Sequence, residues 1–199
     1  HRHFRRQRQM CIRDSPEVLI KGYAFSADKL KSDFNLIEAG LAGNQPFTIE
    51  AWVWNPGFNP QEILVGWGRQ GAGSGAVMHF GHGSNSNYGA AGHAGFGLGW
   101  SADARVDSTG RWAHVVYTYD DNGDQRLFLN GEPDNARIGN NVNFNPASTF
   151  TGGNPVHVYL GAGNNASSEN FAVQAFQGTM ASLSMLKRAL NAETVRENF

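Results

Sequence analysis

The chain has 199 residues, of which 40% are hydrophobic and 12% aromatic, and its formal net charge is −1. A chain of this size can bury one sizeable core, so we expect a single domain. Because no run of apolar residues is long enough to cross a bilayer, we expect no transmembrane helix and no membrane partner.

The first 15 residues, HRHFRRQRQMCIRDS, differ in composition from the rest of the chain. Residues 1–13 hold five arginines and no acid, which leaves 11 basic against 17 acidic residues and a formal net charge of −6 for residues 14–199. An acidic body repels nucleic acid, so we expect no nucleic-acid partner, and a basic arm remains the alternative interpretation of the head. Its RQMCIRDS resembles the translated adaptor sequence found at the ends of metagenomic reading frames. We therefore predict a non-native or disordered head, residues 1–15, followed by one folded domain, residues 16–199.

Apolar periodicity predicts the first strands of this domain. Residues 23–37 alternate weakly, which indicates an edge strand and its turn. The segment FTIEAWVW, residues 47–54, is largely apolar on both alternating sets, and this is typical of a central strand. The turn residues of NPGFNP follow, and EILVGWG, residues 62–68, predicts the next strand.

The middle of the chain, residues 66–100, is rich in glycine, histidine and small polar residues. We predict two or three strands here, around residues 76–82 and 95–100. In GFGLGW, residues 95–100, glycines alternate with three bulky residues, so an extended chain would carry bare backbone on one face.

The segment RWAHVVYTYDDNGDQRLFLNGE, residues 111–132, predicts a β-hairpin. Residues 112–119 and 126–129 are rich in aromatic and β-branched residues, and Asp-Asn-Gly between them supplies a turn that tolerates positive φ. A polar loop over residues 133–155 and a strand over residues 156–160 follow.

The last third of the domain completes an all-β pattern. A loop, GAGNNASSENFAVQ, precedes a pair of strands in AFQGTMASLSMLKRA, residues 175–189. Asn191 before Ala-Glu-Thr-Val then fits the N-cap of a short helix. The whole chain predicts an all-β sandwich with a short C-terminal helix.

Four motifs in this order also indicate a family. FTIEAWVW, EILVGWG, the RWAHVVYTYD…QRLFLNGE hairpin and LGAG…FQG…LSMLKRALNAETV together resemble the laminin G-like branch of the concanavalin A-like lectin/glucanase superfamily, including its pentraxin-like modules. The resemblance covers residues 22–199 and implies that the all-β fold is a two-sheet antiparallel jelly-roll β-sandwich. It also implies an extracellular, periplasmic or cell-surface location. It implies less about activity, because members include glycan binders, protein-adhesion modules and glycosidases.

The carboxylates give little support to catalysis. A retaining glycosidase needs two carboxyl groups about 5 Å apart, and the related laminarinase-type enzymes carry E-x-D-x-E on one strand. The only E-x-D here is Glu132-Pro133-Asp134, where proline argues against a central strand, and Asp103 and Asp107 lie in a segment that we predict to be a loop. Cys11 is in the head, so the body has no thiol nucleophile and no thiolate zinc site. We expect no catalytic residues, with a glycoside hydrolase as a distant alternative.

The resemblance also implies where a calcium site would lie. The corresponding positions are Gln61 before the EIL strand, Asn164 and Asn165 after LGA, and Gln174 before AFQG. Calcium prefers several oxygen ligands that include charged ones, and these positions offer neutral amides, to which Glu169 could add one carboxylate. We interpret the site as degenerate and expect no metal and no cofactor, with calcium doubtful.

The glycine-rich middle offers a metal-free binding surface. Sugars are recognised by aromatic faces that stack on C–H surfaces and by amides, hydroxyls and imidazoles that bond to their hydroxyl groups. The bare face of GFGLGW and the loop SNSNYG combine such groups. The alternative is that the rings belong to the core and that the glycines let a neighbouring ring lie flat on the sheet. The predicted ligand-binding residues are His82, Asn85, Asn87, Tyr88, His93 and Trp100.

The sequence therefore predicts a non-catalytic recognition module that is part of a larger, exported, multidomain protein. We expect its partner to be a glycan. Binding of an extracellular protein, in adhesion or as a structural spacer, is the alternative.

Overall fold

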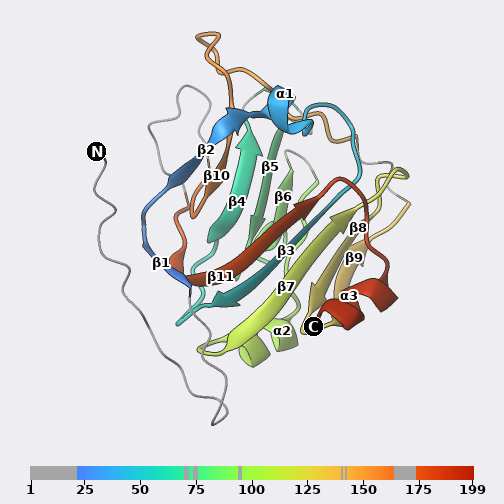
Figure 1. The fold of residues 1–199 in the computed structure, drawn as a ribbon. Coiled ribbons are helices and arrows are strands. Elements are labelled where there is room, and N and C mark those ends of the chain that lie inside the picture. The colour runs from blue at the N-terminus through green and yellow to red at the C-terminus, as the bar shows by residue number, and fades with distance from the viewer. Residues whose placement is uncertain are drawn as a thin grey trace.

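The computed structural model describes residues 22–69, 72–73, 76–93, 96–139, 141, 143–163 and 174–199. In this part of the chain two antiparallel β-sheets pack face to face, and three short helices lie around them (Figure 1). The predicted all-β sandwich with a short C-terminal helix is confirmed. The predicted head, residues 1–15, falls outside the described residues.

One sheet has six strands in the order β1-β11-β3-β7-β8-β9. Its two central strands, β3 and β7, pair along their whole length, from Phe47 opposite Tyr119 to Trp54 opposite Trp112. Alternate residues of β3, such as Ile49 and Val53, are fully buried against the second sheet, so the predicted central strand is confirmed. The strands are β1 (Tyr23–Ser26), β3 (Phe47–Trp54), β7 (Trp112–Tyr119), β8 (Gln125–Leu129), β9 (Glu132–Arg137) and β11 (Gln177–Leu186).

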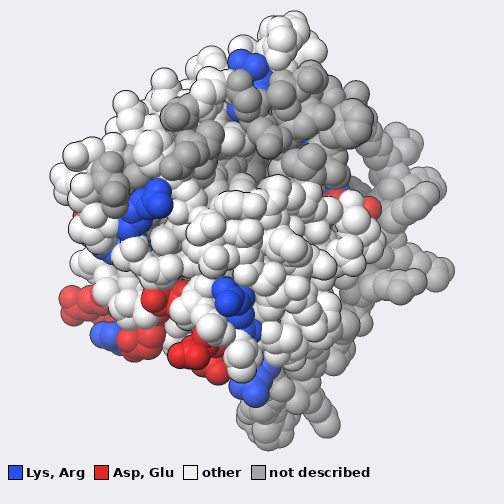
Figure 2. All heavy atoms as spheres, turned by 180° about the vertical axis from the view of Figure 1, so that it is seen from behind, with Lys and Arg blue, Asp and Glu red and all other residues white. Residues whose placement is uncertain are grey.

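The other sheet has five strands in the order β2-β10-β4-β5-β6. They are β2 (Leu30–Asn35), β4 (Ile63–Gly68), β5 (Val77–Gly81), β6 (Ala91–His93) and β10 (His157–Leu160). β4 lies in the centre and every one of its residues is buried. On the outer face the sheet carries an uncharged row in register, made of Tyr159, Gly66, His79 and Gly92. Figure 2 shows this side of the molecule with an uncharged centre and with charged side chains gathered toward the lower left.

Three capped helices complete the described fold. They are α1 (Leu36–Ala39), α2 (Ala102–Ser108) and α3 (Ala192–Asn198). The side chain of Asn191 accepts a hydrogen bond from the backbone N–H of Thr194 at 2.8 Å, which confirms the predicted N-cap of the last helix. No helix in the described residues has the length and apolar character needed to span a membrane.

Some predicted strands differ in extent. Residues 23–37 form two edge strands in different sheets, β1 and β2, followed by α1. Residues 175–189 contain one long strand, β11, whose register with β3 shifts between Met180 and Leu183. The start of the predicted polar loop is strand β9, which has no apolar alternation because it is an edge strand with largely exposed side chains.

The segment between β6 and β7 also differs from the prediction. Residues 102–108, predicted as a loop that carries Asp103 and Asp107, form α2, whose first turn is capped by the Ser101 hydroxyl. A helix of two turns is too short to show a clear apolar period in the sequence. The strand predicted over residues 95–100 is reduced, within the described residues 96–100, to one bridge between Leu98 and Ala91.

The C-terminal helix packs on the outer face of the six-stranded sheet. Val195 of α3 and Leu190 before it form a small buried cluster with Val116 of β7 and Phe128 of β8. This cluster is separate from the main core between the sheets, whose large buried rings include those of Trp67 and Tyr117. α3 and the segment before it therefore stand above the sheet and form one side of a groove.

Candidate functional site

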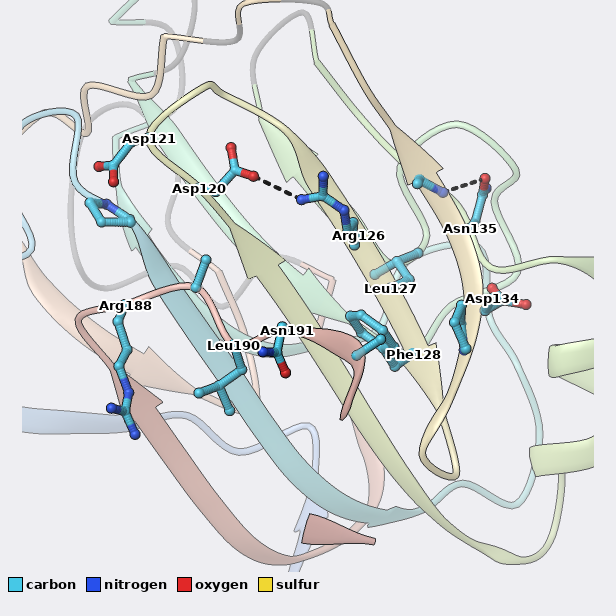
Figure 3. A pocket seen from close by; sticks show the side chains of 15 residues that line it. Asp120, Asp121, Arg126, Leu127, Phe128, Asp134, Asn135, Arg188, Leu190 and Asn191 are labelled. Carbon is cyan, nitrogen blue, oxygen red and sulfur yellow. Dashed lines mark hydrogen bonds and ion pairs between the residues drawn. The ribbon is translucent and has the colours of Figure 1, made fainter. Parts of the chain in front are cut away.

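A groove of about 950 Å³ lies on the outer face of the six-stranded sheet, beside the segment that leads into α3 (Figure 3). One wall comes from the β7–β8 turn and β8, a second from β9, and a third from residues 188–192, with Pro46 next to it. The first two walls are consecutive in the chain, whereas residues 188–192 and Pro46 are far from them in the sequence, so only the folded sheet brings all of these segments together.

The β7–β8 turn presents Asp120 to the groove. One carboxylate oxygen of Asp120 accepts hydrogen bonds from the backbone N–H groups of Asn122 and Asp124, both at 3.0 Å. Gly123 closes the turn with a φ of 76°, a conformation that glycine adopts without strain. The turn therefore fixes Asp120 through its backbone and leaves the second oxygen, Oδ2, to accept from a side chain.

Arg126 is held over the sheet by two carboxylates. It lies on the outward face of β8, where its guanidinium donates from Nη1 to Asp120 at 2.8 Å and from Nη2 to Asp124 at 3.0 Å. Partial burial alone would raise the pKa of Asp120, but hydrogen bonds from Arg126 and from two backbone amides, with the guanidinium charge, hold the pKa below its usual value. The pair is therefore ionised and fixed in one geometry at neutral pH.

The second wall is edge strand β9. Asp134 accepts hydrogen bonds from both the backbone N–H and the hydroxyl of Ser101. Asn135 donates from its side chain to the carbonyl of Gly99 at 2.8 Å. These bonds tie β9 to the segment before α2, so the wall is supported by the neighbouring chain rather than by a further strand.

The third wall is fixed by one buried hydroxyl. Thr48 of β3 donates to the carbonyl of Arg188 at 2.8 Å and accepts from the backbone N–H of Leu190 at 2.9 Å. Phe128 and Leu190 lie beneath the groove and are almost fully buried, 2% and 8% exposed, whereas its accessible apolar lining comes from Pro46, Pro133 and Ala136. Arg188 is exposed, and in Figure 3 its side chain runs away from the Asp120–Arg126 pair.

Two of the six predicted binding residues, His82 and Trp100, are buried. Burial lowers the pKa of His82 to about 3, and its Nε2 lies 3.0 Å from the hydroxyl oxygen of Ser108. Because that hydroxyl donates to the Ala104 carbonyl, Nε2 carries the imidazole hydrogen. Trp100 donates from its indole N–H to the Gly81 carbonyl at 3.0 Å. Both rings belong to the core, which was the alternative interpretation, and neither is exposed to a ligand.

Three other predicted residues, Asn85, Asn87 and Tyr88, lie together on one turn. Asn85 accepts hydrogen bonds through its side-chain oxygen from the backbone N–H groups of Asn87 at 2.9 Å and Tyr88 at 3.2 Å. The ring of Tyr88 is 39% exposed. The backbone of His93 belongs to β6, but its side chain is outside the described residues. The ligand-binding role of this turn stays a prediction.

The chain itself covers the glycine face on which the binding surface was predicted. A Cβ atom added to Gly97 would lie 2.2 Å from the carbonyl oxygen of Asn87, and one added to Gly99 would lie 2.3 Å from that of Ser86. A Cβ on Gly92 would lie 1.8 Å from the His79 ring. The glycines therefore let a turn and a ring pack on the backbone, and the predicted groove over Gly97 and Gly99 is not formed.

The calcium positions can be followed in part. Gln61 and Gln174 belong to adjoining segments, because the N–H of Ile63 donates to the Gln174 carbonyl at 2.9 Å. Asn164, Asn165 and Glu169 are outside the described residues. Within the described residues no group of three or more His, Cys, Asp or Glu side chains is arranged to hold a metal ion.

The buried acid next to Gln61 is engaged with amides. Glu62 has no exposed surface, and its carboxylate accepts from the side chain of Asn55 at 2.7 Å and from the backbone and side chain of Asn59 at 3.2 Å and 3.0 Å. This acid ties the loop before β4 to the sheet. Sequence reasoning did not single it out, because a lone glutamate before a strand gives no sign of burial.

Comparison with known proteins gives one family and several solved structures. The model of the concanavalin A-like lectin/glucanases superfamily matches residues 29–196. No curated protein matches the sequence significantly.

Three solved structures with similar folds each have less than a fifth sequence identity to this chain. The CBM40 of Ruminococcus gnavus IT-sialidase bound to α2,3-sialyllactose has 17% identity and a TM-score of 0.58 over 87% of this chain and 98% of that one. Domain 4 of AbnA, an extracellular arabinanase from Geobacillus stearothermophilus in complex with arabinotriose, has 17% identity and a TM-score of 0.50 over 78% and 66%. A protein from Bacteroides ovatus described as carbohydrate binding has 18% identity and a TM-score of 0.54 over 87% of this chain, which spans only 45% of its length.

Proposed function

This chain belongs to the concanavalin A-like lectin/glucanases superfamily, and from that premise we propose that it is a non-catalytic module that binds a glycan. The binding site is the groove between β8, β9 and residues 188–192. The observation that carries the proposal is the fixed Arg126–Asp120 pair in a groove whose lining also includes the apolar side chains of Pro46, Pro133 and Ala136.

The chemistry of the groove suits a sugar. A guanidinium donates through its N–H groups and a carboxylate only accepts, so the pair can bond to neighbouring hydroxyl groups of a sugar ring in both senses. Pro46, Pro133 and Ala136, which are partly or fully exposed in the lining, offer the C–H face of the ring an apolar surface. Because hydrogen bonds and turns hold the walls in place, little ordering is needed when a ligand binds.

The groove carboxylates fit recognition better than hydrolysis. A glycosidase needs one carboxylic acid whose pKa is raised so that it can protonate the leaving group. Asp120 has a lowered pKa because of Arg126, and Asp134 accepts two hydrogen bonds from Ser101. Glu132, the remaining acid of the E-x-D motif, pairs with Arg196 on the surface and also has a lowered pKa because of that bond.

The wider setting is part of the same proposal. The similar structures include modules in complex with a sugar, which are parts of a larger or an extracellular protein. We therefore place this chain in an exported, multidomain protein. Adhesion to another protein is the second candidate, favoured by the exposed apolar side chains of Phe34 and Ile37 around the Asn35 cap of α1.

The test is a glycan array with the full chain, followed by calorimetric titration of the bound glycans. Arg126→Ala should weaken binding about tenfold, the effect of losing one charge-assisted hydrogen bond. Circular dichroism should show that this variant keeps the fold. Asp121→Ala is a second groove variant, at a residue that takes no part in the ion pairs of Arg126. Asp33→Asn on β2 is the control and should keep full affinity. Wild-type affinity in both groove variants would disprove the assignment of the site.

A further inference from the structure

We infer that the groove selects uncharged glycans and rejects glycans that carry carboxylates. The inference rests on the proposed function and adds the chemical class of the ligand. It follows from how the charges of the groove are paired.

The fixed cation of the groove is already neutralised. Arg126 donates to two different carboxylates, Asp120 and Asp124, at 2.8 Å and 3.0 Å. Two carboxylates around one guanidinium leave a local formal charge of −1. A ligand carboxylate would be a third acid at this guanidinium, and the two already present are held in place by backbone N–H groups, Asp120 by its own turn and Asp124 by Gly139 at 2.8 Å.

The remaining charges of the lining do not reverse this balance. The lining holds three carboxylates, of Asp120, Asp121 and Asp134, and two guanidinium groups, of Arg126 and Arg188. Its formal charge is therefore −1. Including Asp124, which pairs with Arg126, makes it −2. Arg188, the other cation, points away from the pair in Figure 3. An anionic ligand at the Asp120–Arg126 pair would therefore meet net repulsion.

A neutral sugar meets no such obstacle. Arg126 has five N–H donors, and two of its nitrogens are engaged with the aspartates through one bond each, so donors remain for ligand hydroxyls. Each hydroxyl can donate to a carboxylate and accept from the guanidinium, and it brings no charge that must be desolvated. The paired charges of the groove thus favour neutral hydroxyl groups.

The experiment compares neutral glycans with glycans that carry a carboxylate. Lactose and arabinotriose are the neutral probes, α2,3-sialyllactose is the acidic one, and an array of neutral and uronate-containing glycans widens the comparison. Among the glycans that bind, we expect neutral members to bind at least about tenfold more tightly than their carboxylated counterparts. We also expect the affinity for neutral glycans to change less than about twofold between low and high salt, because no ion pair forms with the ligand.

A charge-reversal variant tests the cause. Asp121→Lys should raise the affinity for acidic relative to neutral glycans by about tenfold, whereas Asp33→Lys on β2 should leave this ratio unchanged. Binding of acidic glycans in preference to neutral ones, with loss in high salt, would overturn the inference alone. So would glycan binding that is insensitive to Arg126→Ala and Asp121→Lys. Failure to bind any glycan would overturn the proposed function and this inference with it.

Discussion

Replacing Glu62 tests whether the buried acid beside the calcium positions is a structural hydrogen-bond acceptor. Its carboxylate accepts from the Asn55 side chain at 2.7 Å and twice from Asn59. Asn55 is fully buried and also donates to the His82 carbonyl at 3.0 Å. The acid therefore links the loop before β4 to the segment that follows β5.

The expected cost can be worked out from these partners. In Glu62→Ala one buried donor of Asn55 loses its acceptor, which costs roughly 1–3 kcal/mol, whereas water can replace the bonds to the exposed Asn59. The cavity left by the side chain adds about 1 kcal/mol, so we expect a loss of roughly 2–4 kcal/mol in the free energy of unfolding. In Glu62→Gln the amide oxygen can still accept from Asn55, but the new NH₂ group lies opposite the NH₂ group of Asn59, which is also a donor. We therefore expect a loss of about 1–2 kcal/mol.

Urea denaturation followed by circular dichroism measures both losses. A matched control is Glu38→Gln in α1, because the exposed Glu38 carboxylate accepts from the backbone N–H of the half-buried N-cap Asn35 and should contribute less than about 1 kcal/mol. If Glu62→Ala were as stable as the wild type, the carboxylate would not be the acceptor that holds Asn55, and the structural role assigned here would be refuted.

Three further predictions concern the metal, the pH dependence and the sequence-predicted turn. Millimolar calcium, and a chelator added afterwards, should leave the melting temperature unchanged, because Gln61 and Gln174 offer only neutral amides and the Glu62 carboxylate is hydrogen-bonded to Asn55. A rise with calcium that the chelator reverses would contradict the interpretation of the site as degenerate. Burial lowers the pKa of His82 from 6.5 to about 3, so between these values the unfolded chain binds a proton that the folded chain does not, and the free energy of unfolding should fall as the pH is lowered from 6.5 toward 3. His82→Gln should flatten this slope in urea titrations at pH 7 and pH 5, and an unchanged slope would show that His82 does not cause it. Tyr88→Ala should keep the fold and the full glycan affinity; a loss of about fivefold, one stacking contact, would move the site to the Asn85–Tyr88 turn.

Strands with strong local patterns could be predicted from the sequence. β3 and β7 are each eight residues long and rich in aromatic and β-branched residues, and the N-cap of α3 depends on Asn191 and the three residues that follow it. Where the local signal is weak, the prediction failed. β9 has no apolar alternation, although Asn130 and Gly131, with φ of 50° and 78°, form the kind of turn that Asn-Gly favours in hairpins and could have indicated it.

The binding surface depended on the tertiary structure. The sequence showed that GFGLGW leaves bare backbone, but only the fold shows that Asn87 and Ser86 pack on Gly97 and Gly99. The groove is built from residues that β-pairing brings together, such as Arg126 and Leu190. Periodicity and turn chemistry act over a few neighbouring residues, so the sequence determined the strands and the family. Which faces are covered and which remain open depends on contacts between distant segments, and these form only when both sheets are assembled.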